Sequence, residues 1–458
     1  MASGFESSGD EELAPRTSLR RILGLGFGIA VIFGGTVGVG ILRMPGTIAG
    51  QLGSFWPIMF VWAAGGGYAM LGALSIAELG TAMPQAGGFY IYSKRAFGPV
   101  AGFAVGWADW LNNCAVVAFA AVAAAEYIAA LVPDVASRST SIALGLLVLF
   151  SGLHWAGLKL SSSIQQLTSS VTAITFLLLA IACLMHPPQA NHSVLSNGFG
   201  RSDGFFNMLV PMVAAFRAIV VTYDGWYEAI YFTEEDTNVS KHLPRAMIGG
   251  ILIVLGLYLL MNLAFLHVLS IPVLSASTLP AADAARIVFP RWSGQFVTVL
   301  ALLTLLSLIN AVLLGAPRIL LAIGRDGIFG ERAAQVDAGG VPRPALLVSS
   351  ATAALFIASG KFEDIIAVAA ILVVSMYCVN YIAVIVLRIR EPQMIRPFRA
   401  WGYPVTTVLV LICSFLFLVA AIHDDPVSTL RAALLLAVAI PAYLWMQRRH
   451  RGHGQAGN

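Results

Sequence analysis

The chain has 458 residues, of which 58% are hydrophobic and only 11% are charged. Soluble globular proteins carry about 25% charged residues, so this composition argues against that class. The formal net charge of +4 is small and requires no nucleic-acid partner.

Apolar runs of membrane-spanning length recur from one end of the chain to the other. About 20 apolar residues cross the hydrocarbon core of a bilayer as a helix. The sequence therefore predicts an all-α integral membrane domain over 22–446, between cytosolic tails at 1–21 and 447–458. The twelve predicted transmembrane helices cover about 22–50, 54–82, 97–131, 141–156, 160–185, 208–233, 246–269, 294–322, 345–359, 363–388, 404–422 and 430–446.

Polar segments separate these runs. We expect loops at 84–98, from Pro187 to Asn207, at 270–292 and from Arg325 to Pro344. With both termini inside the cell, our count places seventeen Lys and Arg residues in cytosolic segments and six in outer segments. Because positive charge is retained on the cytoplasmic side, this orientation in the cell membrane is the predicted one.

The first predicted helix is interrupted at its centre. Residues 32–41 read Ile-Phe-Gly-Gly-Thr-Val-Gly-Val-Gly-Ile, with four glycines in seven residues. Each glycine inside a helix costs about 1 kcal/mol relative to alanine. Irregular backbone at mid-membrane depth is tolerated only where it faces protein or a water-filled cavity. We therefore interpret this segment as backbone that is available to a ligand.

The sixth predicted helix carries a second interruption at Thr222-Tyr223-Asp224-Gly225. The sixth helix begins five membrane crossings after the first helix. Because five is an odd number, the second half of the chain would enter the membrane from the opposite side. Interrupted helices at matching positions of two halves indicate a midplane substrate site in an inverted-repeat transporter. We predict five-plus-five repeats at about 22–185 and 208–388, with two extra helices at 404–446. The alternative is that the glycines only permit close helix packing.

Interrupted helices can bind a zwitterion mainly through their backbone. The amide end of a half-helix attracts a carboxylate, and the carbonyl end suits an ammonium group. Gly38, Val39 and Gly40 are the candidates for the carboxylate end. The complete predicted substrate-binding set is Thr36, Val37, Gly38, Val39, Gly40, Ile41, Val221, Thr222, Tyr223, Asp224 and Gly225.

Charged residues inside predicted helices are costly and usually face the interior of the bundle. Arg217, Asp224 and Glu228 lie in the sixth helix, and Asp109 lies in the third. Asp224 could pair with Arg217, cap a resumed helix, contact a substrate amine or serve as a protonatable coupling site.

Two further residues are candidates for a coupling or structural role, together with Arg217. Lys159 opens the fifth helix and is either an interfacial anchor or an ammonium placed against carbonyls of the first break, where a sodium ion would sit. Asn310, in the eighth helix, is a buried amide whose role is more often structural.

Several motifs together resemble one known family. They are Gly34–Ile41, Ala77-Glu78-Leu79-Gly80, Pro84–Tyr90, Tyr223-Asp224-Gly225-Trp226 with Glu234-Glu235, Gly157-Leu158-Lys159 with Gln165, Arg325-Asp326-Gly327, and Arg388–Pro392. The chain resembles the amino acid–polyamine–organocation (APC) superfamily of permeases, nearest to the L-type amino acid transporter branch and its bacterial relatives. The resemblance implies a leucine-transporter-like fold and amino acid transport. It also implies that the fifth-helix lysine, here Lys159, bridges the first helix to the eighth in sodium-independent members.

The chain departs from this family pattern at three points. Val39 stands where a serine is usual, so the backbone amide remains but a hydroxyl contact to the carboxylate is lost. Val221 stands where many members place an aromatic gate. The external cysteine that links L-type members to a heavy subunit is absent between the third and fourth helices, so we expect the chain to work without that subunit.

The predicted function is secondary transport of a neutral amino acid by sodium-independent exchange or proton-linked movement. One alternative is a polyamine or cationic amine permease, and another is a transport-dead ligand sensor. An enzyme is not expected, because no nucleophile with a base, phosphate loop or metal-ligand cluster is recognisable. The four cysteines lie in apolar runs without metal-ligand spacing, so no cofactor or metal is predicted. Substrate identity and oligomeric state stay open.

Overall fold

The computed structural model describes residues 18–188, 205–328, 334–337, 339–360 and 362–455. Within these residues the protein is helical and no β-strand is present. Its α-helices are α1 (Leu25–Thr36), α2 (Gly40–Leu52), α3 (Phe55–Ala82), α4 (Phe89–Phe97), α5 (Pro99–Leu131), α6 (Ser139–Trp155), α7 (Leu158–Met185), α8 (Phe205–Thr222), α9 (Val239–Val268), α10 (Ile271–Ala276), α11 (Pro280–Val288), α12 (Ser293–Arg325), α13 (Arg343–Ser359), α14 (Phe362–Arg390), α15 (Val405–Asp424) and α16 (Pro426–Gln455). Two 3₁₀-helices, η1 (Pro133–Arg138) and η2 (Glu228–Phe232), complete the set.

The helices make this chain a multi-pass membrane protein. In the described part, eight helices are long and apolar enough to span a membrane, or nine if α1 and α2 form one broken span. Three shorter apolar helices cover Val210–Thr222, Arg343–Ser359 and Pro426–Pro441. Large apolar side chains such as Leu167, Ile174 and Leu178 are more than half exposed on α7, as lipid contact requires.

Most predicted helix bounds agree with the structure to within a few residues. Three expectations need correction. The predicted loop at 84–98 contains α4, which forms because Phe89, Tyr90 and Tyr92 can bury one helix face. The predicted loop at 270–292 contains α10 and α11, each with a proline in its first turn, where proline is tolerated. α16 continues to Gln455, beyond the predicted end at 446.

Parts of four predicted segments lie outside the described residues. These are 1–17 of the first tail, 456–458 of the second, 189–204 of the external loop, and 329–333 with 338 of the later loop.

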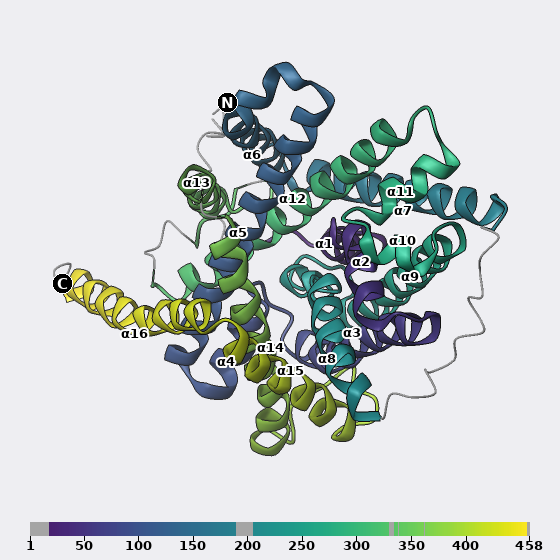
Figure 1. Cartoon of the computed structure of the whole chain (residues 1–458). Helices are drawn as coiled ribbons and strands as arrows, with labels where there is room; N and C mark the ends of the chain where they lie inside the picture. The colour runs from purple at the N-terminus through teal and green to yellow at the C-terminus, as the bar shows by residue number, and fades with distance from the viewer. Residues whose placement is uncertain (1–17, 189–204, 329–333, 338, 361, 456–458) are drawn as a thin grey trace, which may run out of the picture.

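The interrupted helices α1, α2 and α8 lie in the interior of the helix bundle, whereas α16 projects from its edge (Figure 1). The middle of α1 is fully enclosed, since Val31 and Ile32 have no exposed surface. Small residues allow this close approach. A Cβ added at Gly28 would lie 2.8 Å from the Ala246 side chain, and one at Gly250 would lie 2.8 Å from Ile32. Glycine therefore sets the spacing between α1 and α9.

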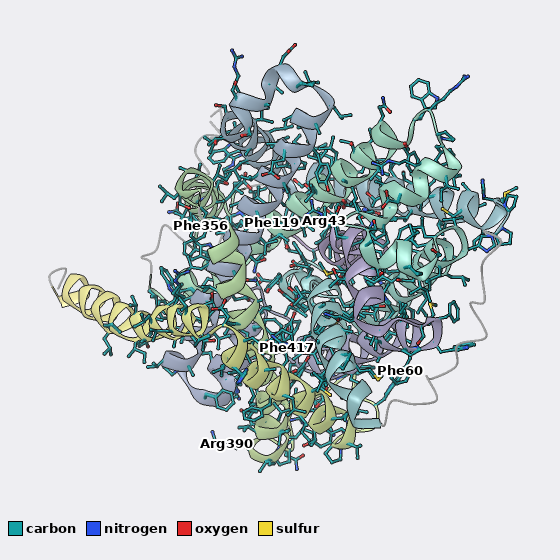
Figure 2. The ribbon with its side chains drawn as sticks, in the orientation of Figure 1. Arg43, Phe60, Phe119, Phe356, Arg390 and Phe417 are labelled. Atoms are coloured by element: carbon teal, nitrogen blue, oxygen red, sulfur yellow. The ribbon has the colours of Figure 1, made fainter. Side chains whose placement is uncertain are left out.

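The surface and interior differ as expected for a protein in lipid. Figure 2 shows Phe60 at the periphery of the bundle, where 60% of its surface is exposed. Phe417, from α15, is only 8% exposed and lies in the packed part of the bundle. An apolar side chain needs no burial against protein where the surrounding solvent is hydrocarbon.

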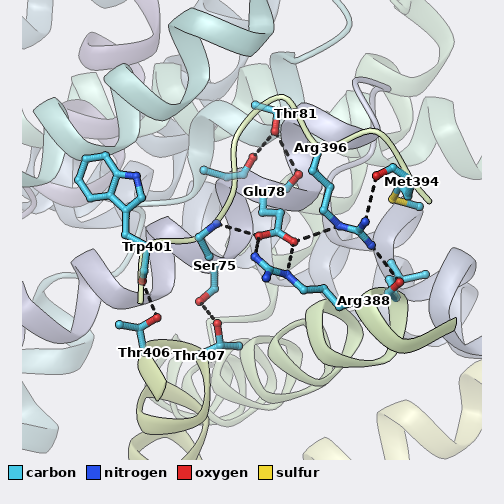
Figure 3. Close-up of polar contacts among 12 residues, drawn as sticks. Ser75, Glu78, Thr81, Arg388, Met394, Arg396, Trp401, Thr406 and Thr407 are labelled. Atoms are coloured by element: carbon cyan, nitrogen blue, oxygen red, sulfur yellow. Dashed lines mark hydrogen bonds and ion pairs between the residues drawn. The ribbon is translucent and has the colours of Figure 1, made fainter. Parts of the chain in front are cut away.

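A buried carboxylate fastens the segment between α14 and α15 to α3. Glu78 has no exposed surface and accepts hydrogen bonds from Arg388, at 2.8 Å for Nε, and from the Ala400 amide at 2.8 Å. Arg396 Nε lies 3.2 Å from the same carboxylate (Figure 3). Two guanidinium groups and an amide therefore compensate for the burial of this charge, as a buried carboxylate requires.

Candidate functional site

The first break lies between α1 and α2, whose axes differ by 50°. Val37 leaves helical geometry with φ −80° and ψ 90°, and the amide of Gly38 donates to the Thr36 carbonyl at 3.0 Å. α2 then begins at Gly40. The amides of Val39, Gly40 and Ile41 stand at the start of this helix. They have no carbonyl of this helix four residues earlier to which they could donate a hydrogen bond. They form the positive end of the α2 dipole at the centre of the bundle.

Access to this break is through its backbone. Gly38, Val39 and Gly40 are partly exposed, whereas the side chains of Val37 and Ile41 are almost completely buried. A Cβ added at Gly38 would meet no atom within 4 Å. The open space beside Gly38 is where a ligand atom could approach the amides of α2.

The second break begins where α8 ends at Thr222. Gly225 adopts φ +100°, a conformation that L side chains rarely adopt. The chain then forms turns and the five-residue η2, so no α-helix resumes on the far side of the break. The interruption at Thr222–Gly225 agrees with the sequence prediction, but turns and η2 replace the helical part that was expected to follow it up to 233. Trp226 is 1% exposed and Tyr227 2%, so these bulky side chains hold the turn against neighbouring helices.

The structure brings the two breaks together. The hydroxyl of Tyr258, on α9, donates to the carbonyls of Thr36 at 3.0 Å and Thr222 at 3.2 Å. A Cβ on Gly40 would lie 2.9 Å from Cγ2 of Thr222. Two segments almost 200 residues apart in the sequence thus share one polar centre in the bundle.

Asp224 does not pair with Arg217. Its carboxylate accepts a hydrogen bond from the hydroxyl of Tyr377 on α14. Arg217 instead forms an ion pair with Asp424 at the end of α15, and its guanidinium lies 5.7 Å from the ring centroid of Phe417. The pairing of Arg217 with Asp224 considered from the sequence is therefore not formed.

An aromatic cluster that sequence reasoning missed supports the second break. The ring centroids of Tyr227 and Tyr377 lie 5.5 Å apart, and those of Tyr227 and Phe89 lie 5.0 Å apart. Trp226 also contacts Tyr377, with centroids 5.3 Å apart. The aromatic residues directly after Gly225 were the signal available in the sequence.

Lys159 does not lie against the first break. Its side chain is exposed at the start of α7, and its carbonyl accepts hydrogen bonds from the hydroxyls of Ser162 and Ser163. The Ala30 carbonyl, on α1, accepts instead from Ser169 Oγ at 2.8 Å and from Gln165 Nε2 at 3.2 Å. Uncharged side chains of α7, and not Lys159, therefore make the hydrogen bonds from α7 to the backbone of α1.

A buried polar network extends from these contacts into α12 and α6. Asn310 Nδ2 donates to Gln165 Oε1 at 2.7 Å, and Asn310 Oδ1 lies 2.8 Å from His154 Nε2. Gln165 Nε2 also donates to Ser307 Oγ at 3.2 Å. Gln165 and Ser169 stand four residues apart in an apolar helix, so they share one face, and this spacing could have revealed the network.

The remaining predicted residues take the following places. Val221 is 48% exposed beside the break, and Thr222 Oγ1 donates to the Ala218 carbonyl at 2.8 Å. Tyr223 Oη donates to the Trp62 carbonyl at 3.1 Å. Thr36 Oγ1 is buried and has no hydrogen-bond partner in the described part of the chain. The breaks thus combine free backbone amides with one unpaired hydroxyl.

A cavity of about 420 Å³ lies elsewhere, between α5, α13, α14 and α16. Its lining includes Leu111, Phe356 and Leu435, and it touches neither break. Its lining also includes Asn112, Ser359 and Arg431, but because it is separate from both breaks we do not include it in the candidate site.

Comparisons with known proteins give a consistent result. Residues 28–443 match the sequence profile of the family described as Amino acid permease. The serine/threonine exchanger SteT of Bacillus subtilis is 25% identical over 441 residues, covering 94% of this chain and 98% of that protein. The human b(0,+)-type amino acid transporter 1 is 26% identical over 414 residues, covering 88% and 83% respectively. The human Asc-type amino acid transporter 1 is 26% identical over 444 residues, covering 93% and 82%.

Proposed function

The chain belongs to the amino acid permease family, and we propose that it carries neutral amino acids across the membrane by alternating access at the paired breaks. Membership makes it a transporter and not an enzyme. The observation that carries the proposal is the junction of the two breaks, where Tyr258 bridges the ends of α1 and α8.

The substrate carboxylate would bind at the start of α2. The amides of Val39, Gly40 and Ile41 and the positive end of the α2 dipole supply what a carboxylate needs. Val39 contributes only its amide there. The unpaired hydroxyl of Thr36 would satisfy a further polar atom of the substrate.

The substrate ammonium would bind at the carbonyl ends of α1 and α8. The carbonyls of Thr36 and Thr222 each accept one hydrogen bond from Tyr258, and a carbonyl oxygen has a second lone pair. Asp224 adds negative charge beside them, while Tyr377 fixes its orientation. One carboxylate site and one ammonium site fit a neutral amino acid. The serine and threonine in the name of the SteT relative support a small neutral substrate for this chain too.

The same proposal covers the architecture and coupling. The eight spanning helices, the broken pair and the three shorter apolar helices support twelve spans. The five-plus-five inverted repeat, the cytoplasmic termini and the absence of a heavy subunit are proposed from the sequence. Coupling would be sodium-independent, by exchange or with protons. The hydrogen bonds of Gln165 and Ser169 to the Ala30 carbonyl support this view, because neutral donors already satisfy that oxygen.

Counterflow in liposomes tests this function. Purified protein is reconstituted with unlabelled serine, threonine, alanine or leucine inside, and entry of the labelled amino acid is measured with and without sodium. We expect saturable entry of at least one neutral amino acid that is independent of sodium. Failure of every amino acid in the panel, or strict dependence on sodium, would contradict the proposal.

The site itself is tested by Gly38→Ala. An added methyl group at Gly38 meets no protein atom within 4 Å, so the protein should fold, but the group would enter the space beside the α2 amides. We expect KM for counterflow to rise by about tenfold, which corresponds to about 1.4 kcal/mol of lost binding. Gly67→Ala is the matched control, since Gly67 also has nothing within 4 Å but lies exposed on α3. Equal KM values for both variants would remove Gly38 from the site.

A further inference from the structure

A buried acid, Glu228, lies close to the second break and has no role in the substrate site described above. Glu228 begins η2 and is 2% exposed. Its Oε2 atom is buried and has no hydrogen-bond partner among the described residues. A buried polar atom without a partner is rare in folded proteins and indicates either an unseen ligand or a functional role.

A second buried acid faces the same place from α5. Asp109 has no exposed surface, and its two carboxylate oxygens accept hydrogen bonds from Tyr231 Oη at 2.8 and 2.9 Å. Asn113 Nδ2 donates to Asp109 at 3.1 Å. Asp109 is thus held in place by Tyr231, which follows Glu228 by three residues on η2, whereas Glu228 keeps an unpaired oxygen.

No cation within the described residues is available to neutralise Glu228. From α12, Arg318 is committed to Glu235, with hydrogen bonds of 2.9 and 3.1 Å. From the turn, Asp224 adds another negative group, and it is bonded to Tyr377 of α14. The other titratable groups on its own segment are the phenols of Tyr227 and Tyr231, and α1 presents only Gly35.

The free oxygen lies against Gly315 of α12, and the described part of the chain contains no group of three or more His, Cys, Asp or Glu side chains that could hold a metal ion. A Cβ added at Gly315 would lie 3.2 Å from Glu228 Oε2 and 3.0 Å from Cδ2 of Tyr231. A metal cation needs several oxygen ligands arranged around it. A proton needs only the carboxylate oxygen itself, and it removes the charge whose burial without a counter-ion is so costly.

Glu228 is in contact with both breaks. Its amide donates to the Gly225 carbonyl at 3.2 Å, and a Cβ on Gly35 would lie 2.6 Å from its Cγ. An ionised Glu228 would need hydration, and opening of the contact between the breaks would change the surroundings of its side chain. The protonation state of Glu228 is therefore coupled to the conformation of the backbone that forms the substrate site.

We propose that Glu228, positioned beside Asp109, is the proton-binding site that couples proton movement to substrate transport. The inference rests on the transport function proposed above and selects proton-linked movement. The carboxylate takes one proton from water on the side to which the site opens. The proton stays on Glu228 as an O–H group while the site changes from one side of the membrane to the other. It then returns to water on the opposite side, and the carboxylate is restored.

The test compares accumulation with exchange in the same liposomes. Wild-type protein, with serine or another counterflow substrate, should accumulate label when the lumen is alkaline, and a protonophore should abolish the accumulation. Glu228→Gln keeps the shape but cannot ionise, so we expect it to lose pH-driven accumulation while counterflow at equal pH persists. Glu126→Gln, at an exposed position on α5, is the matched control and should accumulate like the wild type.

A second measurement needs no variant. Addition of substrate outside wild-type liposomes loaded with a pH-sensitive dye should acidify the lumen. Absence of acidification while counterflow is intact would overturn the proton site and leave the transport function standing. Undiminished accumulation by Glu228→Gln would also overturn it. Absence of wild-type counterflow for every substrate would instead refute the proposed function itself.

Discussion

Gly35 and Gly225 are in direct backbone contact where the two breaks cross. A Cβ added at Gly225 would lie 2.4 Å from the carbonyl oxygen of Gly35, closer than real Cβ contacts occur. Gly225 also has φ +100°. Each break therefore keeps its shape only because the other break has no side chain at the contact.

This contact predicts that Gly225→Ala strongly impairs the protein. The substitution combines a positive φ, which costs about 1–2 kcal/mol for a residue with a Cβ, with a backbone overlap that flexible side chains cannot relieve. We expect a lower thermal unfolding temperature in detergent and no counterflow. Gly249→Ala is the control, because a Cβ there meets nothing within 4 Å. Normal transport by Gly225→Ala would show that the breaks do not need this contact.

The polar network on α7 predicts different effects at two neighbouring glutamines. Gln165→Ala leaves Asn310 Nδ2 and the Ala30 carbonyl each with one partner fewer. Ser169 still donates to the Ala30 carbonyl and Asn310 Nδ2 still donates to the Ser161 carbonyl, so each lost hydrogen bond should cost about 0.5–1.5 kcal/mol in thermal unfolding. Gln166→Ala and Lys159→Ala change exposed side chains and should shift stability by less than about 0.5 kcal/mol. A larger effect of Lys159→Ala would restore the lysine hypothesis.

The buried ion pair between Glu235 and Arg318 predicts a large loss when one partner is removed. Both side chains are almost fully buried, at 0% and 4% exposure. Glu235→Ala leaves an unpaired guanidinium and should cost about 3–5 kcal/mol of unfolding free energy. The double variant Glu235→Leu with Arg318→Met should recover most of that loss, because no buried charge is left.

A surface pair provides the comparison for that experiment. Arg286 is 69% exposed in its pair with Asp283, and Arg286→Ala should cost less than about 1 kcal/mol. Equal losses at the buried and surface pairs would contradict the burial of Glu235.

Glu234 lies outside the membrane spans, and its environment predicts that the folded state loses stability in acid. Burial raises the pKa of Glu234, but hydrogen bonds from Arg325 and the Ala86 amide outweigh burial and hold this pKa below its usual value. The ionised form therefore stabilises the folded state fully above about pH 4.3, the usual glutamate pKa. This stabilisation is lost as the pH falls through the lowered pKa.

Glu234→Gln tests this linkage. The variant should be less stable than the wild type at neutral pH, and its stability should change less between about pH 5 and pH 3, where ordinary glutamates titrate. Thermal unfolding in detergent across this range measures both. Parallel curves for variant and wild type would show that Glu234 does not contribute to acid sensitivity.

Much of the architecture could be predicted from the sequence because it depends on local composition. Long apolar runs gave the helix bounds of α3, α5 and α7 closely, and the glycines at 34–40 indicated the end of α1. Short elements were missed. α4 is amphipathic within a segment rich in turn residues, and η2 follows Gly225, whose φ of +100° is incompatible with a continuing α-helix.

The sequence by itself determined that the chain crosses a membrane repeatedly and that helical structure is interrupted near residues 37–39 and after Thr222, since apolar length and glycine content act locally. Only the tertiary structure decided which buried polar groups meet. Arg217 pairs with Asp424 and not with Asp224, Lys159 faces outward, and Gln165 reaches the first break. In an α-helix one residue of register turns a side chain by about 100°. Partners distant in the sequence are therefore fixed by how whole helices rotate and pack.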